Sequence, residues 1–242
     1  MRDPFRTLDF FTFGGVNSLD YGAILSECRV IKKPGITYTR TAVPGRSGDL
    51  YTYEERMENV DIAYDCQITH DLLKNFDTFN ALMTRQIGYR RIEDTLYPER
   101  FRLGVFRGAL DPAYMRVHRS AKFTVTFNCK PQHYLKAGER VQTYTASGTI
   151  RNPALFESRP LIRVYGAGVV NVGSYKLTIA SHTSAYMDID CDIEDAFCGT
   201  TNLNSYLTID ADDYPRLNEG DTGIVLGTGI TKVEITPRWY TV

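Results

Sequence analysis

Hydrophobic and polar residues alternate most regularly between Val60 and Thr69. The apolar positions are Val60, Ile62, Tyr64, Cys66 and Ile68, with mostly polar residues between them. Successive side chains of an extended strand point to opposite faces, so this period of two predicts one apolar and one polar face. We therefore predict a strand that covers one side of a core.

The period changes in the next segment, from His70 to Ile87. Its apolar residues recur at steps of three and four: Leu72, Leu73, Phe76, Phe79, Leu82, Met83 and Ile87. Such spacing places them on one stripe of an α-helix. Thr69 or Asp71 is expected to cap the start and Gly88 to end the helix. A single amphipathic helix in a strand-rich chain is expected to lie across a sheet.

Short segments rich in aromatic and β-branched residues fill the rest of the chain. They predict strands over 8–13, 24–31, 90–92, 100–106, 113–117 and 122–130, with a break at Pro131, and over 161–165, 169–172, 176–179, 186–189, 206–209, 223–226 and 232–235. Turn residues recur every ten or so positions, which is typical of β-sandwiches. The predicted fold class is mainly β.

A polar stretch between Tyr134 and Pro153 contains few large apolar residues. We place a domain boundary there and expect residues 1–135 and 136–242 to fold separately. A chain of 242 residues can supply two cores of this size. Lysine, arginine, aspartate and glutamate give the first part a net charge of +3 and the second −4, a small difference that suggests two kinds of surface.

The overall charge and the ends of the chain exclude several classes of protein. A net charge of −1 argues against nucleic-acid binding, which needs a basic field. No basic segment followed by an apolar one opens the chain, and no apolar run is long enough for a transmembrane helix. We expect folding in a cytosol, with the five cysteines reduced and mostly buried as small apolar residues: Cys28, Cys66, Cys129, Cys191 and Cys198.

One acidic run suggests a metal site and then departs from the pattern. Asp188, Asp190, Asp192 and Glu194 alternate as in a calcium loop, but the positions that need glycine and glutamate hold Ile193 and Gly199. The run fits a strand better, with Met187, Ile189, Cys191 and Ile193 pointing inward and the acids forming a solvated face. Weak calcium binding at this surface stays as an alternative.

Other candidate chemistry lacks a supporting pattern. Cys191 and Cys198, with His182 nearest, do not make a structural zinc set. The four histidines do not lie beside a nucleophile motif, and Gly166-Ala167-Gly168 is not set in a βαβ unit. We therefore predict no catalytic, cofactor or metal residues, and no enzyme activity.

The stretch Pro44-Gly45-Arg46-Ser47-Gly48-Asp49-Leu50 could be read as a phosphate-binding loop. It has no lysine, and Tyr51-Thr52-Tyr53 follows instead of a helix. Gly45 and Gly48 suit positive φ in a loop between strands. We predict a turn, and local chemistry does not explain its arginine and aspartate.

In order and spacing, these segments resemble the distal tail protein (Dit) family of long-tailed, siphovirus-type bacteriophages. The resemblance rests on Phe13-Gly14-Gly15, Asp20-Tyr21-Gly22, the 44–50 loop, the strand and helix over 60–87 and the strand that ends near Tyr134; further along it rests on Ile150–Pro153, Arg159–Gly166, Met187–Cys191, Tyr214–Gly220 and Ile235–Trp239. Each motif alone is weak, but the set spans nearly the whole chain. Asp221-Thr222 departs from the family, which often has an asparagine there.

The resemblance implies an N-terminal β-sandwich with one helix and a hairpin, followed by a C-terminal galectin-like β-sandwich. It further implies a hexameric ring that joins the tail tube protein to the tail-associated tip protein. Receptor-binding proteins are further possible partners. The expected location is the virion tail tip, after synthesis and assembly in the bacterial host cytoplasm.

For the ring interface we select Arg46, Asp49, Arg90 and Arg91, because the N-terminal part has many tyrosines and arginines, which are types enriched at interfaces. The alternative is that they are plain surface charges. A rival function is recognition of host cell-wall saccharide by the C-terminal part, with Trp239 as the candidate stacking ring. A hydrolase has no motif in its favour.

Overall fold

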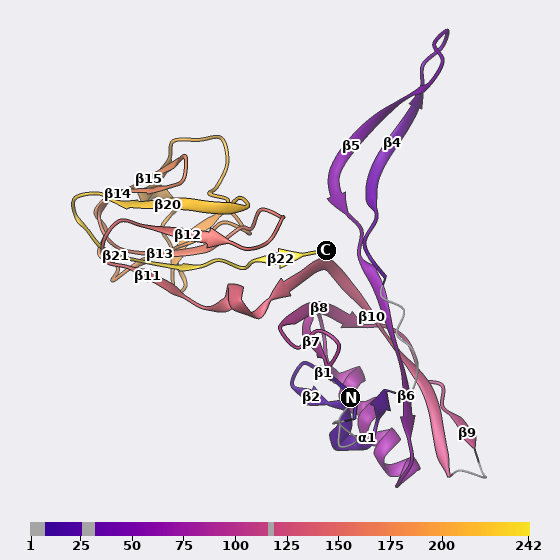
Figure 1. Cartoon of the computed structure of the whole chain (residues 1–242). Coiled ribbons are helices and arrows are strands. Elements are labelled where there is room, and N and C mark those ends of the chain that lie inside the picture. The colour runs from indigo at the N-terminus through magenta and orange to yellow at the C-terminus, as the bar shows by residue number, and fades with distance from the viewer. Residues whose placement is uncertain (1–7, 26–31, 116–118) are drawn as a thin grey trace, which may run out of the picture. The chain divides into compact units, whose positions relative to one another are not determined.

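The computed structural model describes residues 8–25, 32–115 and 119–242, and Figure 1 shows the arrangement of its elements. The chain separates into two compact units, one of Met1–His133 with Val242 and one of Tyr134–Thr241. We call them unit 1 and unit 2. The division falls two residues before the boundary expected from the sequence, in the same polar region. No described helix is long and apolar enough to cross a membrane.

Unit 1 is built on one large antiparallel sheet with the strand order β2-β1-β7-β8-β10-β6-β3, and β9 pairs with β10. Its elements are β1 (Phe11–Phe13), β2 (Val16–Asn17), the 3₁₀ helix η1 (Ser18–Tyr21), β3 (Ile24–Leu25), β6 (Val60–Ile68), α1 (Leu72–Arg85), β7 (Arg90–Asp94), β8 (Arg100–Phe106), β9 (Ala113–Met115) and β10 (Ser120–Leu135). Strands β4 (Ile36–Ala42) and β5 (Asp49–Met57) form a separate two-stranded sheet.

The large sheet curls so that its strands enclose an aromatic core. Phe11 of β1 stacks on Tyr64 of β6 with 4.9 Å between ring centroids, although three strands separate β1 from β6 in the sheet order. Phe127 of β10 lies 5.5 Å from Phe11 and 4.7 Å from Phe13. A flat sheet would hold these strands apart, so the ring contacts establish a sandwich-like layer.

Helix α1 covers this core with part of the predicted stripe, because Leu73 and Ile87 of that stripe are 67% and 82% exposed. Phe76, Phe79 and Met83 are buried, and each contributes about 1.5–3 kcal/mol relative to an exposed side chain. The predicted cap is wrong in its chemistry: Asp71 stands at the N-cap with a φ of 46° and makes no side-chain capping bond. The helix ends at Arg85, and the N–H of Gln86 donates to the carbonyl of Met83.

Two strand predictions in unit 1 change in length. Strand β10 continues through Pro131 to Leu135, whereas a break at Pro131 was predicted. Pairing with β6 ends at Cys129 and Val60, so the missing N–H of Pro131 costs no bond on that side. Of the strands predicted over 24–31 and 113–117, residues 26–31 and 116–117 lie outside the described residues.

Unit 2 is a sandwich of two antiparallel sheets. One has the order β11-β21-β13-β16-β17-β18 and the other β12-β20-β14-β15-β19. The strands of the two sheets are β11 (Gln142–Tyr144), β12 (Gly148–Asn152), β13 (Leu161–Gly166), β14 (Gly168–Val172), β15 (Tyr175–Ile179), β16 (Met187–Asp190), β17 (Asp195–Cys198), β18 (Thr201–Asn202), β19 (Leu207–Ile209), β20 (Gly220–Leu226) and β21 (Ile230–Thr236). The 3₁₀ helices are η2 (Lys136–Glu139) and η3 (Asn204–Tyr206), and the short strand β22 (Tyr240–Thr241) belongs to neither sheet.

Alternate residues of both sheets meet in one core. Ile162, Val164 and Ile235 from the first sheet and Val170 and Leu177 from the second are fully buried in the same cluster. The period of two in these short strands therefore has the expected consequence, an apolar layer between two sheets. Together the units give the mainly β class predicted from the sequence.

Candidate interaction surfaces

The most exposed element of unit 1 is the β4–β5 hairpin, drawn as a ribbon pair in Figure 1. Tyr38 pairs with Tyr53, Arg40 with Tyr51 and Ala42 with Asp49. Residues directly opposite each other in an antiparallel pair lie on the same face. One face of the hairpin therefore carries Tyr38, Arg40, Asp49, Tyr51 and Tyr53, and we call it the tyrosine face.

The tyrosine face is apolar in its rings and charged toward its tip. Tyr38, Tyr51 and Tyr53 are 57%, 57% and 53% exposed, and the rings of Tyr38 and Tyr51 meet edge to face at 5.2 Å. No other described strand pairs with the hairpin. An isolated two-stranded hairpin is marginally stable in water, so this element gains from contact with another surface.

The tip of the hairpin is the 44–50 stretch, and it is a turn. Gly45 and Gly48 have φ values of 77° and 93°, and a Cβ on either would meet nothing within 4 Å. The left-handed conformation, not crowding, therefore favours glycine at both positions. The N–H of Arg46 donates to the carbonyl of Val43 at 3.3 Å, which closes the first part of the turn.

The four residues selected for the interface lie in two places. Arg46 is exposed at the hairpin tip, and Asp49 accepts from Arg40 Nε at 2.5 Å on the tyrosine face. Arg90 is exposed at the start of β7. Arg91 pairs with Glu93, and its guanidinium carbon lies 3.9 Å from the centroid of the Phe101 ring. The large sheet thus carries one pair of these residues and the hairpin the other.

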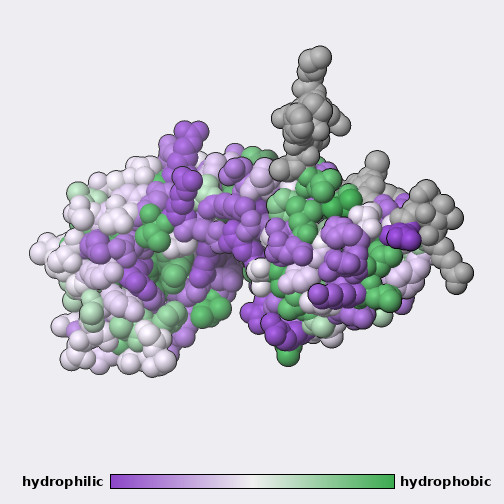
Figure 2. Space-filling view, turned by 90° about the horizontal axis from the view of Figure 1, so that it is seen from below, coloured by the Kyte–Doolittle hydropathy of each residue, from purple (hydrophilic) through white to green (hydrophobic). Residues whose placement is uncertain are grey.

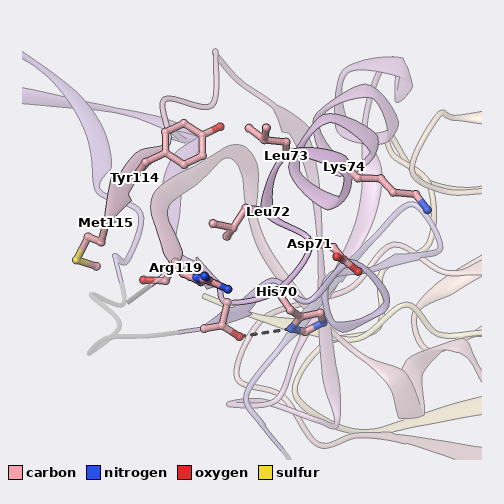
Figure 3. Close-up of a pocket in the computed structure, with 10 residues that line it drawn as sticks. His70, Asp71, Leu72, Leu73, Lys74, Tyr114, Met115 and Arg119 are labelled. Atoms are coloured by element: carbon pink, nitrogen blue, oxygen red, sulfur yellow. Dashed lines mark hydrogen bonds between the residues drawn. The ribbon is translucent and has the colours of Figure 1, made fainter. Parts of the chain in front are cut away.

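A depression of about 840 Å³ lies where α1 begins. Residues 69–74 form one wall, and Tyr114, Met115, Arg119 and Ser120 form the other (Figure 3). Leu73 and Tyr114 are 67% and 50% exposed, so the depression is apolar at its rim. His70 Nδ1 lies 3.4 Å from the hydroxyl of the adjacent Thr69, and no carboxylate of the described residues hydrogen-bonds this histidine. The lining fits apolar contact better than acid–base chemistry.

Asp188 and Asp190 of the acidic run are buried against arginines, so the prediction of a solvated acidic face is wrong for these two, whereas Asp192 and Glu194 are exposed as predicted. Asp188 is 5% exposed and accepts from Arg163 at 2.6 and 2.8 Å. Asp190 is 8% exposed and accepts from Arg238 at 2.6 and 2.8 Å. Cross-strand pairing places Asp188 opposite Arg163, whereas Arg238, which donates to Asp190, follows the end of strand β21. The sequence spacing cannot show either contact. Two-pronged arginine pairs fill the oxygens that a calcium ion would need.

The inward pattern predicted for the same run holds in part. Met187, Ile189 and Cys191 are buried, but Ile193 is 63% exposed. Strand β16 ends at Asp190, and Ile193 lies within the turn over 191–194 that follows it, where Glu194 has a φ of 58°. No group of three or more metal-binding side chains occurs within the described parts of the chain.

Trp239 is buried, and so are three of the cysteines, Cys66, Cys129 and Cys191. Cys198 is half-buried, and Cys28 lies outside the described residues. Trp239 is 7% exposed within the core of unit 2, so its ring is not available for stacking on a sugar. Burial is the main cause that raises the pKa of the Cys129 thiol to about 12, and it also raises the pKa of Cys191. Both thiols are therefore poor nucleophiles at neutral pH.

Sequence reasoning missed the tyrosine face and its ion pair. Strand β4 alternates too weakly between apolar and polar residues to be identified, because both of its faces are exposed. The sequence signal for this face is a set of three tyrosines, Tyr38, Tyr51 and Tyr53, on the two sides of a turn that contains two glycines. Elsewhere, green apolar residues reach the surface beside purple ones on the face shown in Figure 2. Exposed apolar residues alone therefore would not have singled out the hairpin.

Comparison with known proteins adds the context of this fold. No protein-family model matches the sequence, and no curated protein matches it. The crystal structure of SPP1 Dit (gp 19.1), described as a paradigm of the hub adsorption apparatus of phages that infect Gram-positive bacteria, aligns with a TM-score of 0.71 at 16% identity over 98% of this chain and 100% of that chain.

Two structures of the phage P2 baseplate in its activated conformation, with calcium and with strontium, also align. Their TM-scores are 0.52 and 0.51 at 8% and 10% identity, over 95% of this chain and 98% and 97% of those chains. At these identities the similarity establishes a shared fold across both units.

Proposed function

We propose that this chain is a structural distal tail protein, the baseplate hub of a long-tailed bacteriophage. The shared fold with a phage hub protein supports this assignment. The observation that carries it is the β4–β5 hairpin, a sheet of its own whose tyrosine face is exposed on a single copy. A protein that works alone would gain little from such an element.

The proposed assembly is a hexameric ring formed by unit 1. A ring needs two different, complementary patches on each copy, because its contacts run head to tail. The tyrosine face is one such patch, and we assign the second to the apolar rim around Leu73 and Tyr114. Tyrosine and arginine are enriched in interface cores, which fits a face that carries three tyrosines and Arg40.

In this proposal the ring joins the tail tube protein above to the tail-associated tip protein below and takes part in host attachment. Unit 2, the galectin-like sandwich, decorates the ring and is the part that receptor-binding proteins would contact. The protein's work is assembly, without catalysis or a cofactor. Its location is the virion tail tip, reached after assembly in the host cytoplasm.

The oligomeric state of the purified chain tests the proposal. Light scattering after size-exclusion chromatography should give six copies at high concentration, and electron micrographs should show sixfold rings. A particle that stays monomeric at every concentration, and that forms no rings in tail preparations, would overturn it.

The hairpin tip supplies a second test. Replacing Arg46 and Asp49 with alanine should weaken the ring, because Asp49 pairs with Arg40 on the tyrosine face. The exposed ion pair itself contributes only about 0.2–1 kcal/mol to folding, so the monomer should unfold at nearly the wild-type urea concentration. Thr52→Ala, on the opposite face of the hairpin, is the matched control. Ring assembly equal to wild type in the double variant would remove these residues from the interface.

A further inference from the structure

Unit 1 contains a group of four basic side chains at the large sheet: Lys33, Arg100, Arg102 and His133. Arg100 and Arg102 share one face of β8, because they stand two residues apart on the strand. His133 comes from β10, the neighbouring strand. Tyr97 links them, because its ring meets His133 at 5.2 Å and lies 5.3 Å from the guanidinium carbon of Arg100.

The innermost member of the group is a buried cation that has no counter-ion among the described residues. Arg102 is 6% exposed, and its Nη1 has no hydrogen-bond partner. Burying a charged group without pairing is costly, and native structures normally supply a partner. Lys33 is exposed and donates to the backbone oxygen of Val242 at 2.9 Å. Within the described ranges no acidic side chain forms an ion pair with Lys33, Arg100, Arg102 or His133.

The electrostatic field at His133 is positive. Burial first, and then the charges of Arg102, Arg100 and Lys33, lower the pKa of His133 to about 3. His133 is 4% exposed, and its Nδ1 is buried without a hydrogen-bond partner. Three cations thus act in the same direction on His133, and Arg102 and His133 each leave one buried polar atom without a partner among the described residues.

We propose that this cluster binds a small tetrahedral oxyanion of the phosphate or sulfate class, with Arg102 as its principal donor. Lys33 and Arg100 supply charge at the outer side, and His133 donates a second buried hydrogen bond. Such an ion carries enough acceptors for several donors at once. A free ion fits better than an acidic side chain from another protein, because Arg102 and His133 expose too little surface for a peptide segment to reach them.

Urea unfolding of the full chain in increasing phosphate, with chloride keeping the ionic strength constant, measures the binding. A ligand that binds only the folded state raises the unfolding midpoint with concentration, and the dependence gives a dissociation constant. Phosphate also stabilises proteins generally through exclusion from their surface, so variants must separate the two effects. Arg102→Met should raise the dissociation constant about tenfold or more. Arg107→Met is the control, because Arg107 is exposed directly after the same strand.

Equal midpoint shifts in wild type, Arg102→Met and Arg107→Met would indicate an adventitious ion only and overturn the proposal, as would the absence of a shift. If Arg102→Met does not fold, the exposed Lys33→Met replaces it, with an expected increase of a few fold in the dissociation constant, and an unchanged constant refutes the site. As an independent readout, phosphate should raise the pKa of His133 in NMR titrations, whereas a general salt effect would leave it in place.

Discussion

Replacing the aromatic side chain of Tyr51 on the tyrosine face should weaken assembly of the proposed hexamer without lowering the stability of the monomer. Tyr51 is 57% exposed on a single copy, and its neighbour Tyr38 lies at 5.2 Å between centroids. A tyrosine buries about 150–250 Å² when fully covered, so about 100 Å² of Tyr51 remains for a partner. At about 25 cal/mol per Å², Tyr51→Ser should cost about 2.5 kcal/mol per interface. That free energy corresponds to a roughly 70-fold weaker association.

The assay is mass photometry or light scattering over a concentration series, which gives the midpoint of ring formation. Urea unfolding of the same variant should change by less than about 0.5 kcal/mol, because no described side chain of the hairpin belongs to either buried core. Tyr206→Ser is the matched control, since this tyrosine is 40% exposed in unit 2.

The reasoning is refuted if Tyr51→Ser assembles at the same concentration as wild type. It is also refuted if Tyr206→Ser weakens assembly equally, because the hairpin would then have no special role. A variant that unfolds early would instead show that Tyr51 stabilises its own copy.

Three further predictions concern stability and its pH dependence. Gly138→Ala should destabilise the protein by about 1–3 kcal/mol in urea, because a Cβ at Gly138 would lie 2.4 Å from the backbone nitrogen of Trp239. Burial would raise the pKa of Asp190, but hydrogen bonds from Arg238 and the backbone outweigh it and lower the pKa below its usual value. The stability from Asp190 is therefore present above about pH 4 and lost as the pH falls through the lowered pKa, and Asp190→Asn should cost about 3 kcal/mol at pH 7 while flattening this acid branch. The folded pKa of His133 is about 3, so the unfolded chain takes up a proton first as the pH falls below about 6.5, and stability declines from there toward pH 3. His133→Gln should remove that decline in thermal melts recorded between about pH 6.5 and pH 3. A dependence of stability on pH that equals that of the wild type would contradict the prediction.

The sequence by itself determined the elements whose pattern has one period and one buried face. Strand β6 and helix α1 were predicted within a few residues, because each must turn a regular apolar stripe toward a core. The turn at Gly45 and Gly48 was also predictable, since positive φ is a local property. The missing cap at Asp71 and the continuation of β10 through Pro131 were not predictable from the sequence. Both depend on which backbone groups find hydrogen-bond partners in the folded chain.

Only the tertiary structure decided the surfaces. Asp188 and Asp190 look like solvated acids in the sequence, yet the fold gives each an arginine partner from a distant part of the chain. Arg102 looks like an ordinary strand arginine until the fold buries it beside His133. The physical reason is the same in both cases. Periodicity reports which side of an element is buried, whereas the charge, burial and partners of a polar group depend on residues that meet only after the chain has folded.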